Sequence, residues 1–277
     1  MEWSKIKNII LVILLFVNGF LLLLVGGQQL QERYSRRATL QNAARVLEQN
    51  GIVLSNEGLV QLSSASLAPM TAGRDLAEED ALARRLLGEE TVCTDQSGGV
   101  YLYTSPMGTA VFRAGGECRV SFSSPIPVES FHADHALNYM TALSLEGEVL
   151  SNAVKPDGTT VITLHQLLHG HPLYTCRVEF TYSPEGLTEI RGSLLLSPGA
   201  SAPSGDTVLD TPTALIRFLS GILDSGDLCS AITSVRPGYL TVSSFGSAFT
   251  LRPVWLVTTN VAQYYLDCTT GTLSRVS

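Results

Sequence analysis

The chain opens with an apolar run long enough to cross a lipid bilayer as a helix. From Ile9 to Val25 the residues are apolar apart from Asn18 and Gly19. With its flanking positions the run covers about 20 residues, which matches the thickness of a bilayer core. No second run of this length follows in the sequence. We therefore expect residues 8–27 to form a single transmembrane helix that holds the protein at the membrane.

A cleaved signal peptide is the alternative interpretation of this run. The small residues of Val25-Gly26-Gly27 are compatible with a cleavage site, and the basic start is typical of an n-region. The run is longer, however, than the roughly 7–15 apolar residues of a typical h-region. Beyond it, four apolar residues repeat at helical spacing: Leu40, Ala43, Ala44 and Leu47. A helix is thus expected to continue outward, which favours a retained anchor.

The lengths of the two flanks predict the orientation of the anchor better than their charges do. Lys5 and Lys7 precede the run and Arg33, Arg36 and Arg37 follow it, so the positive-inside rule is nearly balanced. A short N-terminal flank before a long domain favours a cytoplasmic N-terminus. We expect residues 1–7 in the cytoplasm and the bulk of the chain outside. The expected interfacial anchor residues are Trp3, Lys5 and Lys7.

Asn18 predicts a contact between the anchor and a second membrane helix. A polar side chain in the hydrocarbon core is costly unless it is hydrogen-bonded, and a bond across a helix interface contributes roughly 0.6–2 kcal/mol. Gly19 allows close approach of a partner helix. Leucines one turn away flank the same face: Leu14, Leu15, Leu21 and Leu22. The alternative is that a long apolar helix simply tolerates one asparagine.

The rest of the chain repeats one order of elements, a helix followed by a meander of strands. Helices are expected near residues 37–50, 75–88 and 130–145 and from Thr211 onward, with Asp75, Ser130 and Thr211 as N-terminal caps. Alternating segments such as Leu173–Tyr182 predict strands. The order recurs about three times without a sequence repeat. The predicted class is α+β, with antiparallel sheets covered on one face by helices and a hairpin at Val254–Asp267.

Two extracytoplasmic regions are expected from this order. Residues 28–128 form the first helix-plus-meander unit, and residues 129–277 contain two further units. The stretch 197–206 is rich in Pro, Gly and Ser and is the expected loop between units.

Charge and cysteine content exclude several classes of function. The net charge is −7 and no long basic run is present, so nucleic acid is not an expected partner. None of the five cysteines forms a C-x-x-C motif, which removes the support for zinc or thioredoxin-like chemistry. Cys118 and Cys176 alternate with apolar residues and are expected on buried strand faces. If a disulfide forms, Cys93–Cys118 is the first candidate, on neighbouring strands.

The five histidines form two local groups, and neither predicts a metal site. His132 and His135 lie one turn apart at a helix start, while His165, His169 and His171 surround a turn. A metal site needs ligands that converge on one point, and solvated polar residues are the favoured interpretation of both groups. H-E-x-x-H, G-x-S-x-G and P-loop motifs are absent from the sequence. We expect no catalytic residues, no cofactor and no bound metal.

The N-terminal block carries a resemblance to a known family. Met1–Lys7, with its Trp-Ser-Lys sequence, runs into an apolar helix with Asn18 near its middle, and this resembles the YycI family. The ending, from Pro253-Val254-Trp255 through Tyr264-Tyr265-Leu266-Asp267 to Gly271, resembles the end of that family and the wider PepSY-like module. Cys268 departs from the pattern, in which a small apolar residue is more usual.

The resemblance implies a regulatory role. YycI-like proteins are membrane-anchored accessories of the YycFG (WalKR) two-component system of Gram-positive bacteria, which controls cell-wall metabolism. They associate with a YycH-like sister protein and with the sensor histidine kinase, largely through transmembrane helices. The expected function is therefore modulation of such a kinase. The alternatives are an exported PepSY-type binding module, acting as a protease inhibitor or ligand sensor without a kinase partner, and an exported cell-envelope enzyme.

Overall fold

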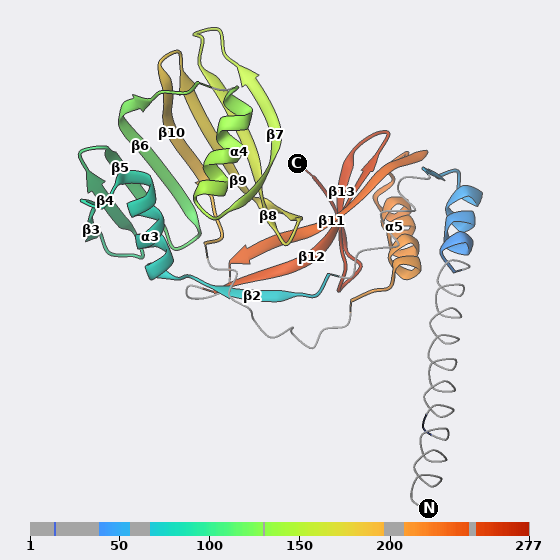
Figure 1. The fold of residues 1–277 in the computed structure, drawn as a ribbon. Coiled ribbons are helices and arrows are strands. Elements are labelled where there is room, and N and C mark those ends of the chain that lie inside the picture. The colour runs from blue at the N-terminus through green and yellow to red at the C-terminus, as the bar shows by residue number, and fades with distance from the viewer. Residues whose placement is uncertain are drawn as a thin grey trace, which may run out of the picture.

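The computed structural model describes residue 14 and residues 39–55, 67–129, 131–196, 208–243 and 248–276. These residues form two lobes joined side by side (Figure 1). The class is α+β, and most strand pairs are antiparallel, as the alternating patterns predict. We call the lobe with α3 and α4 the large lobe and the lobe with α5 the small lobe.

The large lobe contains two helix-plus-meander units in succession. The first unit consists of α3 (Leu76–Leu87), β3 (Val92–Asp95), β4 (Tyr101–Ser105), β5 (Gly108–Phe112) and β6 (Glu117–Ile126). The second unit consists of α4 (His132–Ala142), β7 (Glu146–Val154), β8 (Thr160–Leu168), β9 (His171–Ser183) and β10 (Gly186–Ser193). The units join through their fourth strands, β6 and β10, which pair antiparallel. The expected boundary near residue 128 thus lies between two units that share one sheet.

Both helices of the large lobe pack on one face of this sheet (Figure 1). The strand order is β3-β4-β5-β6-β10-β9-β8-β7. Alternate residues of the strands point under the helices, and the largest of these side chains include Phe180, Tyr182 and Leu164, none of which is exposed. Removal of this apolar surface from water is the main force that holds the helices to the sheet.

The small lobe combines both ends of the described chain. Its C-terminal part is the third unit, made of α5 (Thr211–Ser225), β11 (Ala231–Ser243), β12 (Ala248–Thr259), β13 (Gln263–Asp267) and β14 (Leu273–Arg275). Its N-terminal part is the helix of residues 39–49, β1 (Val53–Leu54) and β2 (Met70–Gly73). β1 pairs parallel with β11, and β2 pairs antiparallel with β12. The helical stripe of Leu40 to Leu47 packs with Phe218, Trp255 and Tyr264 in one core.

The recurring order of helix and meander is confirmed in all three units, and so is the terminal hairpin, in which Val254 pairs with Asp267. β12, however, begins before the expected hairpin: it starts at Ala248 and continues through Pro253 to Thr259. Pro253 does not end it because this residue lies where β12 changes its partner on one edge from β2 to β13. A missing N–H is tolerated at such an interruption of the ladder.

Helix starts agree with the sequence at α3 and differ at α5. Asp75 caps α3, because its Oδ1 accepts hydrogen bonds from the N–H groups of Ala77 (2.9 Å) and Glu78 (3.3 Å). At α5 the cap is Asp210, whose backbone is extended, and the expected cap Thr211 is the first helical residue. Ser130, the expected cap of α4, lies outside the described residues, and Phe131 occupies the cap position.

The expectation that Cys93 and Cys118, the first candidates for a disulfide, lie on neighbouring strands is wrong. Cys93 lies on β3 and Cys118 lies on β6, with β4 and β5 between them in the sheet. All five cysteines are free. The alternation pattern does not predict β3, whose residues are all exposed, and so it misplaces the strand next to Cys93 in the sheet.

Candidate functional site

The lobes meet at β9, a strand that both of them use. Its C-terminal half pairs with β10 as far as Val178 opposite Gly192. Its N-terminal end lies beside β11, with Leu173 opposite Tyr239 in a parallel pair. Between these two contacts the chain of β10 leaves the sheet at Ser193 and β11 takes its place. This exchange of neighbours leaves a cleft between the lobes, which we call the seam cleft.

The seam cleft is a cavity of about 150 Å³ with a mixed lining. Its polar groups are side chains of Thr175, Cys176, Ser193 and Thr241, and its apolar wall includes Leu194, Leu195 and the ring of Phe249. Gly115, in the turn between β5 and β6, lies at its edge. A cavity of this size can hold a molecule about as large as benzene.

Side-chain hydroxyls replace the backbone ladder at the cleft. The N–H of Thr241 donates a hydrogen bond to Oγ1 of Thr175 over 2.9 Å, and the two threonine hydroxyls also contact one another. The Sγ of Cys176 lies 3.7 Å from Oγ1 of Thr241. Thr175 and Thr241 therefore hold β9 and β11 together just where their backbones begin to diverge.

The chemistry of the lining favours binding over catalysis. Burial raises the pKa of the Cys176 thiol, so the thiol stays protonated and is a poor nucleophile. Among the described residues that line the cavity, none is a histidine, carboxylate, lysine or arginine that could act as acid, base or counter-ion. The groups present can donate and accept hydrogen bonds and pack against a small neutral molecule or a side chain.

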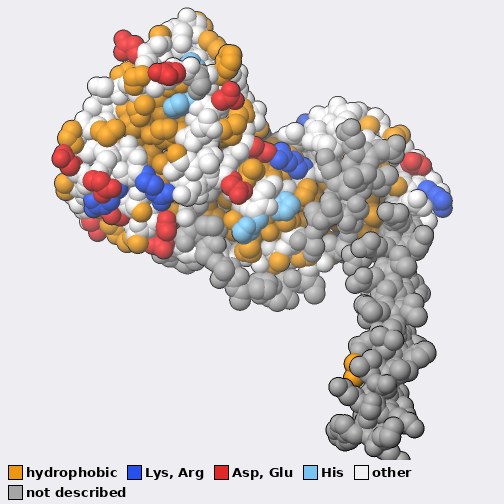
Figure 2. Space-filling model, viewed as in Figure 1, with side chains coloured by type: hydrophobic (Ala, Val, Ile, Leu, Met, Phe, Trp, Pro, Cys, Tyr) orange, Lys and Arg blue, Asp and Glu red, His pale blue; other side chains and the backbone are white. Residues whose placement is uncertain are grey.

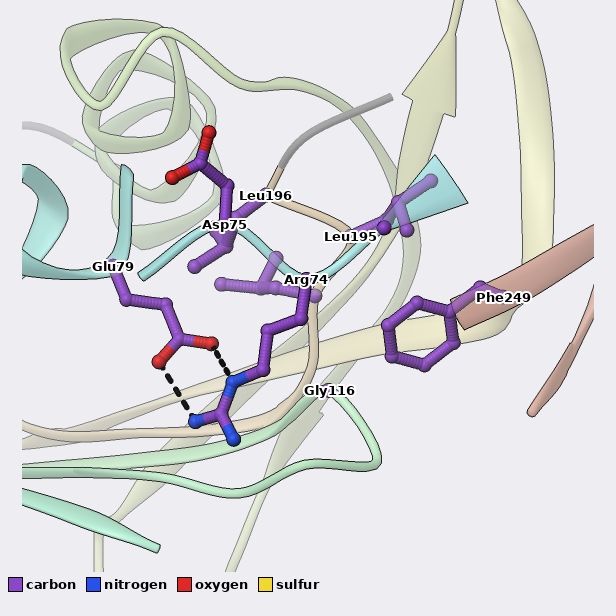
Figure 3. Close-up of a pocket in the computed structure, with 9 residues that line it drawn as sticks. Arg74, Asp75, Glu79, Gly116, Leu195, Leu196 and Phe249 are labelled. Atoms are coloured by element: carbon purple, nitrogen blue, oxygen red, sulfur yellow. Dashed lines mark hydrogen bonds and ion pairs between the residues drawn. The ribbon is translucent and has the colours of Figure 1, made fainter. Parts of the chain in front are cut away.

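A second, smaller crevice adjoins the cleft and contains a buried ion pair (Figure 3). Arg74 Nε donates to Glu79 Oε1 over 2.5 Å and Nη2 donates to Oε2 over 2.8 Å. Its third contact is a 2.6 Å bond from Nη1 to the carbonyl of Gly99. The two charged side chains are only 8% and 6% exposed. This pair fixes the chain where it passes from β2 in the small lobe to α3 in the large lobe, and its role is structural.

A buried glutamine holds Leu195, one of the residues that line the seam cleft. Gln166 of β8 donates from Nε2 to the carbonyl of Leu195 over 2.7 Å, and its Oε1 accepts from the N–H of Leu195 over 2.8 Å. The side-chain amide of Gln166 thus makes the two hydrogen bonds to the Leu195 backbone that a neighbouring strand would otherwise make. Close by, Gly192 has a φ of 152°, and a Cβ there would lie 2.0 Å from the carbonyl oxygen of Arg177. The close approach at Gly192 and the hydrogen bonds of Gln166 therefore fix the point at which the chain of β10 leaves the sheet.

His132 and His135 pack on the sheet. The ring of His132 stacks on Tyr182 at a centroid distance of 4.4 Å, and His135 Nδ1 lies 3.0 Å from the hydroxyl of Tyr182. Burial lowers the pKa of His135, with a further contribution from His132. His169 has a φ of 50° in the turn before β9, which begins at His171. Over the described ranges, no three His, Cys, Asp or Glu side chains gather as a metal site would require.

The site residues predicted from the sequence lie outside the described residues, with one exception. Leu14 is described, and its side chain is exposed. The others are Asn18, Gly19, Leu15, Leu21 and Leu22 of the expected helix interface and Trp3, Lys5 and Lys7 of the interfacial anchor. Within the described part of the chain, no helix combines the length and apolar character needed to cross a bilayer. The expected transmembrane segment, residues 8–27, lies outside the described residues apart from Leu14.

Sequence reasoning does not find the seam cleft. The alternation of β9 predicts Thr175 on the outer face of its strand, and no pattern selects Ser193 or Thr241. Cys176 is buried, as its apolar neighbours predict. The four residues lie on three different strands, so no local spacing joins them.

Comparisons with known proteins identify a similar fold but no family. No protein-family profile matches the chain, and no curated protein matches it. An uncharacterized protein from Eubacterium rectale superposes with a TM-score of 0.50 at 10% identity, over 82% of this chain and 90% of that one. The YpeB C-terminal domain of Bacillus megaterium gives 0.39 at 12% identity, over 74% and 99%. The first likeness is one of fold alone, and the second score is too low to support an argument.

Proposed function

We propose that this protein is a membrane-anchored regulatory interaction protein that binds protein partners and transforms no substrate. The observation that supports a binding role is the seam cleft, an open cavity between two lobes with a neutral lining. None of the described residues that line it is a base that could activate the hydroxyl groups, and burial keeps the thiol protonated. Acidic and basic side chains are scattered over the visible surface without a continuous patch of either sign (Figure 2).

The proposed partner is a sensor histidine kinase that controls cell-wall metabolism, together with a YycH-like sister protein. Support for this partner comes from the Trp-Ser-Lys block of Met1–Lys7 and from Asn18 in the apolar run that follows. In this proposal residues 8–27 cross the cell membrane with the N-terminus in the cytoplasm. Regulation passes through contacts between the anchor and the helices of the partners. The polar Asn18 supplies the specific contact.

The test is a set of anchor variants assayed in cells. Asn18→Leu should insert normally but bind the kinase and sister protein about fivefold more weakly, because one interhelical hydrogen bond of about 1 kcal/mol is lost. The matched control is Leu23→Ile, which lies five residues after Asn18 and therefore on the other side of the helix. An anchor of equal length made only of leucine should hold the protein in place and leave kinase output unregulated. The measurements are co-purification and target-promoter activity.

The alternative function is an exported PepSY-type binding module, a protease inhibitor or ligand sensor without a kinase partner. It is favoured by the seam cleft itself and by the PepSY-like ending at Tyr264–Gly271. Thr241→Val keeps the side-chain shape and removes one hydroxyl from the cleft. If this change abolishes function in cells while the all-leucine anchor retains it, the anchor proposal is overturned and the exported module is supported.

A further inference from the structure

A row of ionisable side chains crosses the joint between the lobes. Glu148 of β7, His165 of β8 and Arg177 of β9 lie opposite one another in the strand register, so their side chains share one face of the sheet. Arg236 of β11 reaches this row from the small lobe, and its Nη2 donates to Oε2 of Glu148. Acidic and basic side chains meet at the neck between the lobes in Figure 2.

His165 is the buried member of this row. It is 5% exposed, its Nδ1 lies 3.8 Å from Glu148 Oε1, and its Nε2 has no hydrogen-bond partner among the described residues. The ring of Tyr174 stands edge-on to it at 5.8 Å. The hydroxyl of Tyr174 donates to the carbonyl of Arg236 over 2.9 Å. We call Glu148, His165, Tyr174, Arg177 and Arg236 the seam cluster.

The seam cluster accommodates a neutral His165 and disfavours a charged one. With neutral imidazole, the charged groups that act on the ring are one carboxylate, that of Glu148, and two guanidinium groups, those of Arg177 and Arg236. Protonation adds a third positive charge and makes both ring nitrogens donors, so Nε2 becomes a buried donor with no acceptor among the described residues. Burial lowers the pKa of His165, and the two arginines lower it further, while Glu148 partly offsets them. A protonated ring would also compete with Arg236 for the carboxylate of Glu148.

We propose that the seam cluster is a pH-sensitive switch that holds the two lobes together while His165 is neutral and releases them when it is protonated. A histidine whose pKa is lowered in the closed form stabilises that form above its ordinary pKa, near 6.5. The stabilisation is lost as the pH falls below that value. Release exposes His165 to water and widens the seam cleft, which lies on the same two strands, β9 and β11. This inference concerns the joint itself and does not depend on a kinase partner.

The test is hydrogen exchange of the full chain in lipid nanodiscs, followed at backbone amides of β9 and β11 and corrected for the intrinsic rates. Between about pH 7.5 and about pH 5, the opening constant of the seam should rise by up to about 30-fold, the ratio set by a histidine of ordinary pKa in the open form. His165→Gln, which cannot titrate, should remove this rise. His132→Gln, which alters a histidine stacked on Tyr182, should retain it.

A second variant and a direct titration of His165 test the switch independently of whether His165→Gln folds. Glu148→Gln removes the carboxylate that bridges Arg236, so the seam should open more readily at both pH values. If His165→Gln gives the wild-type pH response, or if Glu148→Gln leaves the seam closed throughout, the switch is overturned. If His165→Gln does not fold, the deciding measurement is the pKa of His165 in the native chain, determined by NMR titration. An ordinary or raised pKa there would also overturn the proposal.

Discussion

Replacing Arg74 by methionine should destabilise the fold by about 3–5 kcal/mol, because it leaves a buried carboxylate without its counter-ion. Glu79 is only 6% exposed, and both of its oxygens accept hydrogen bonds from the Arg74 guanidinium. Glu79→Leu should cost a similar amount for the converse reason. Since domains are stable by about 5–15 kcal/mol, either change removes a large share of the total.

The double variant distinguishes this reasoning from a general loss of packing. With Arg74→Met and Glu79→Leu together, no buried charge remains, and apolar replacements of similar volume are often neutral or stabilising. The double variant should therefore be more stable than either single variant. The assay is urea unfolding of the full chain in nanodiscs, followed by circular dichroism at constant pH.

The same helix offers a matched control. Arg84 pairs with Asp80 on α3, but those side chains are 39% and 40% exposed. Water screens such a pair, so Arg84→Met should have a much smaller effect than Arg74→Met. A special role of the buried pair is refuted if the two arginine variants are equally destabilised, or if the losses from Arg74→Met and Glu79→Leu simply add in the double variant.

Three further outcomes are expected. Gln166→Leu should lower the free energy of unfolding by about 1–3 kcal/mol in urea titrations, because it leaves a buried backbone N–H and carbonyl without partners. Gly192→Ala should lower the melting temperature measured by calorimetry, since its Cβ would lie 2.0 Å from the Arg177 carbonyl oxygen; an unchanged value would contradict the pairing of β10 with β9 at this residue. In alkylation at about pH 8, exposed Cys93 should react first, whereas burial raises the pKa of Cys118 to about 12, so mass spectrometry should find Cys118 modified only after unfolding.

The sequence predicts those parts of the fold that depend on neighbouring residues. Period-two alternation identifies β9, and the Asp75 cap identifies the start of α3. The sequence does not predict β7, because most of its residues are exposed and apolar and polar residues do not alternate along it. The joining of two units into the large lobe is not predicted for a different reason: β6 and β10 are far apart in the sequence, so their pairing leaves no local pattern.

The candidate site is less predictable than the fold. A cleft formed by an exchange of strands depends on how sheets meet, and Thr175 and Thr241 are ordinary strand residues until they meet. Glu148, His165 and Arg236 likewise come together only through register and lobe packing. The apolar residues Leu164 and Leu168 around His165 are a local sign of a buried histidine in a strand, but they do not indicate its partners.

The small lobe also sets an order on the folding of the chain. Its first helix, residues 39–49, obtains its core from α5, β12 and β13, and Ser55 bonds to Thr233 across 178 positions of sequence. Each unit of the large lobe, in contrast, is built from strands that follow one another directly, and such local contacts form quickly. During synthesis the N-terminal residues are made first, but they cannot pack until the C-terminal residues of the same core have been made. The segment next to the expected anchor therefore becomes ordered last, when the whole polypeptide is present, and a truncated chain would keep that segment unfolded.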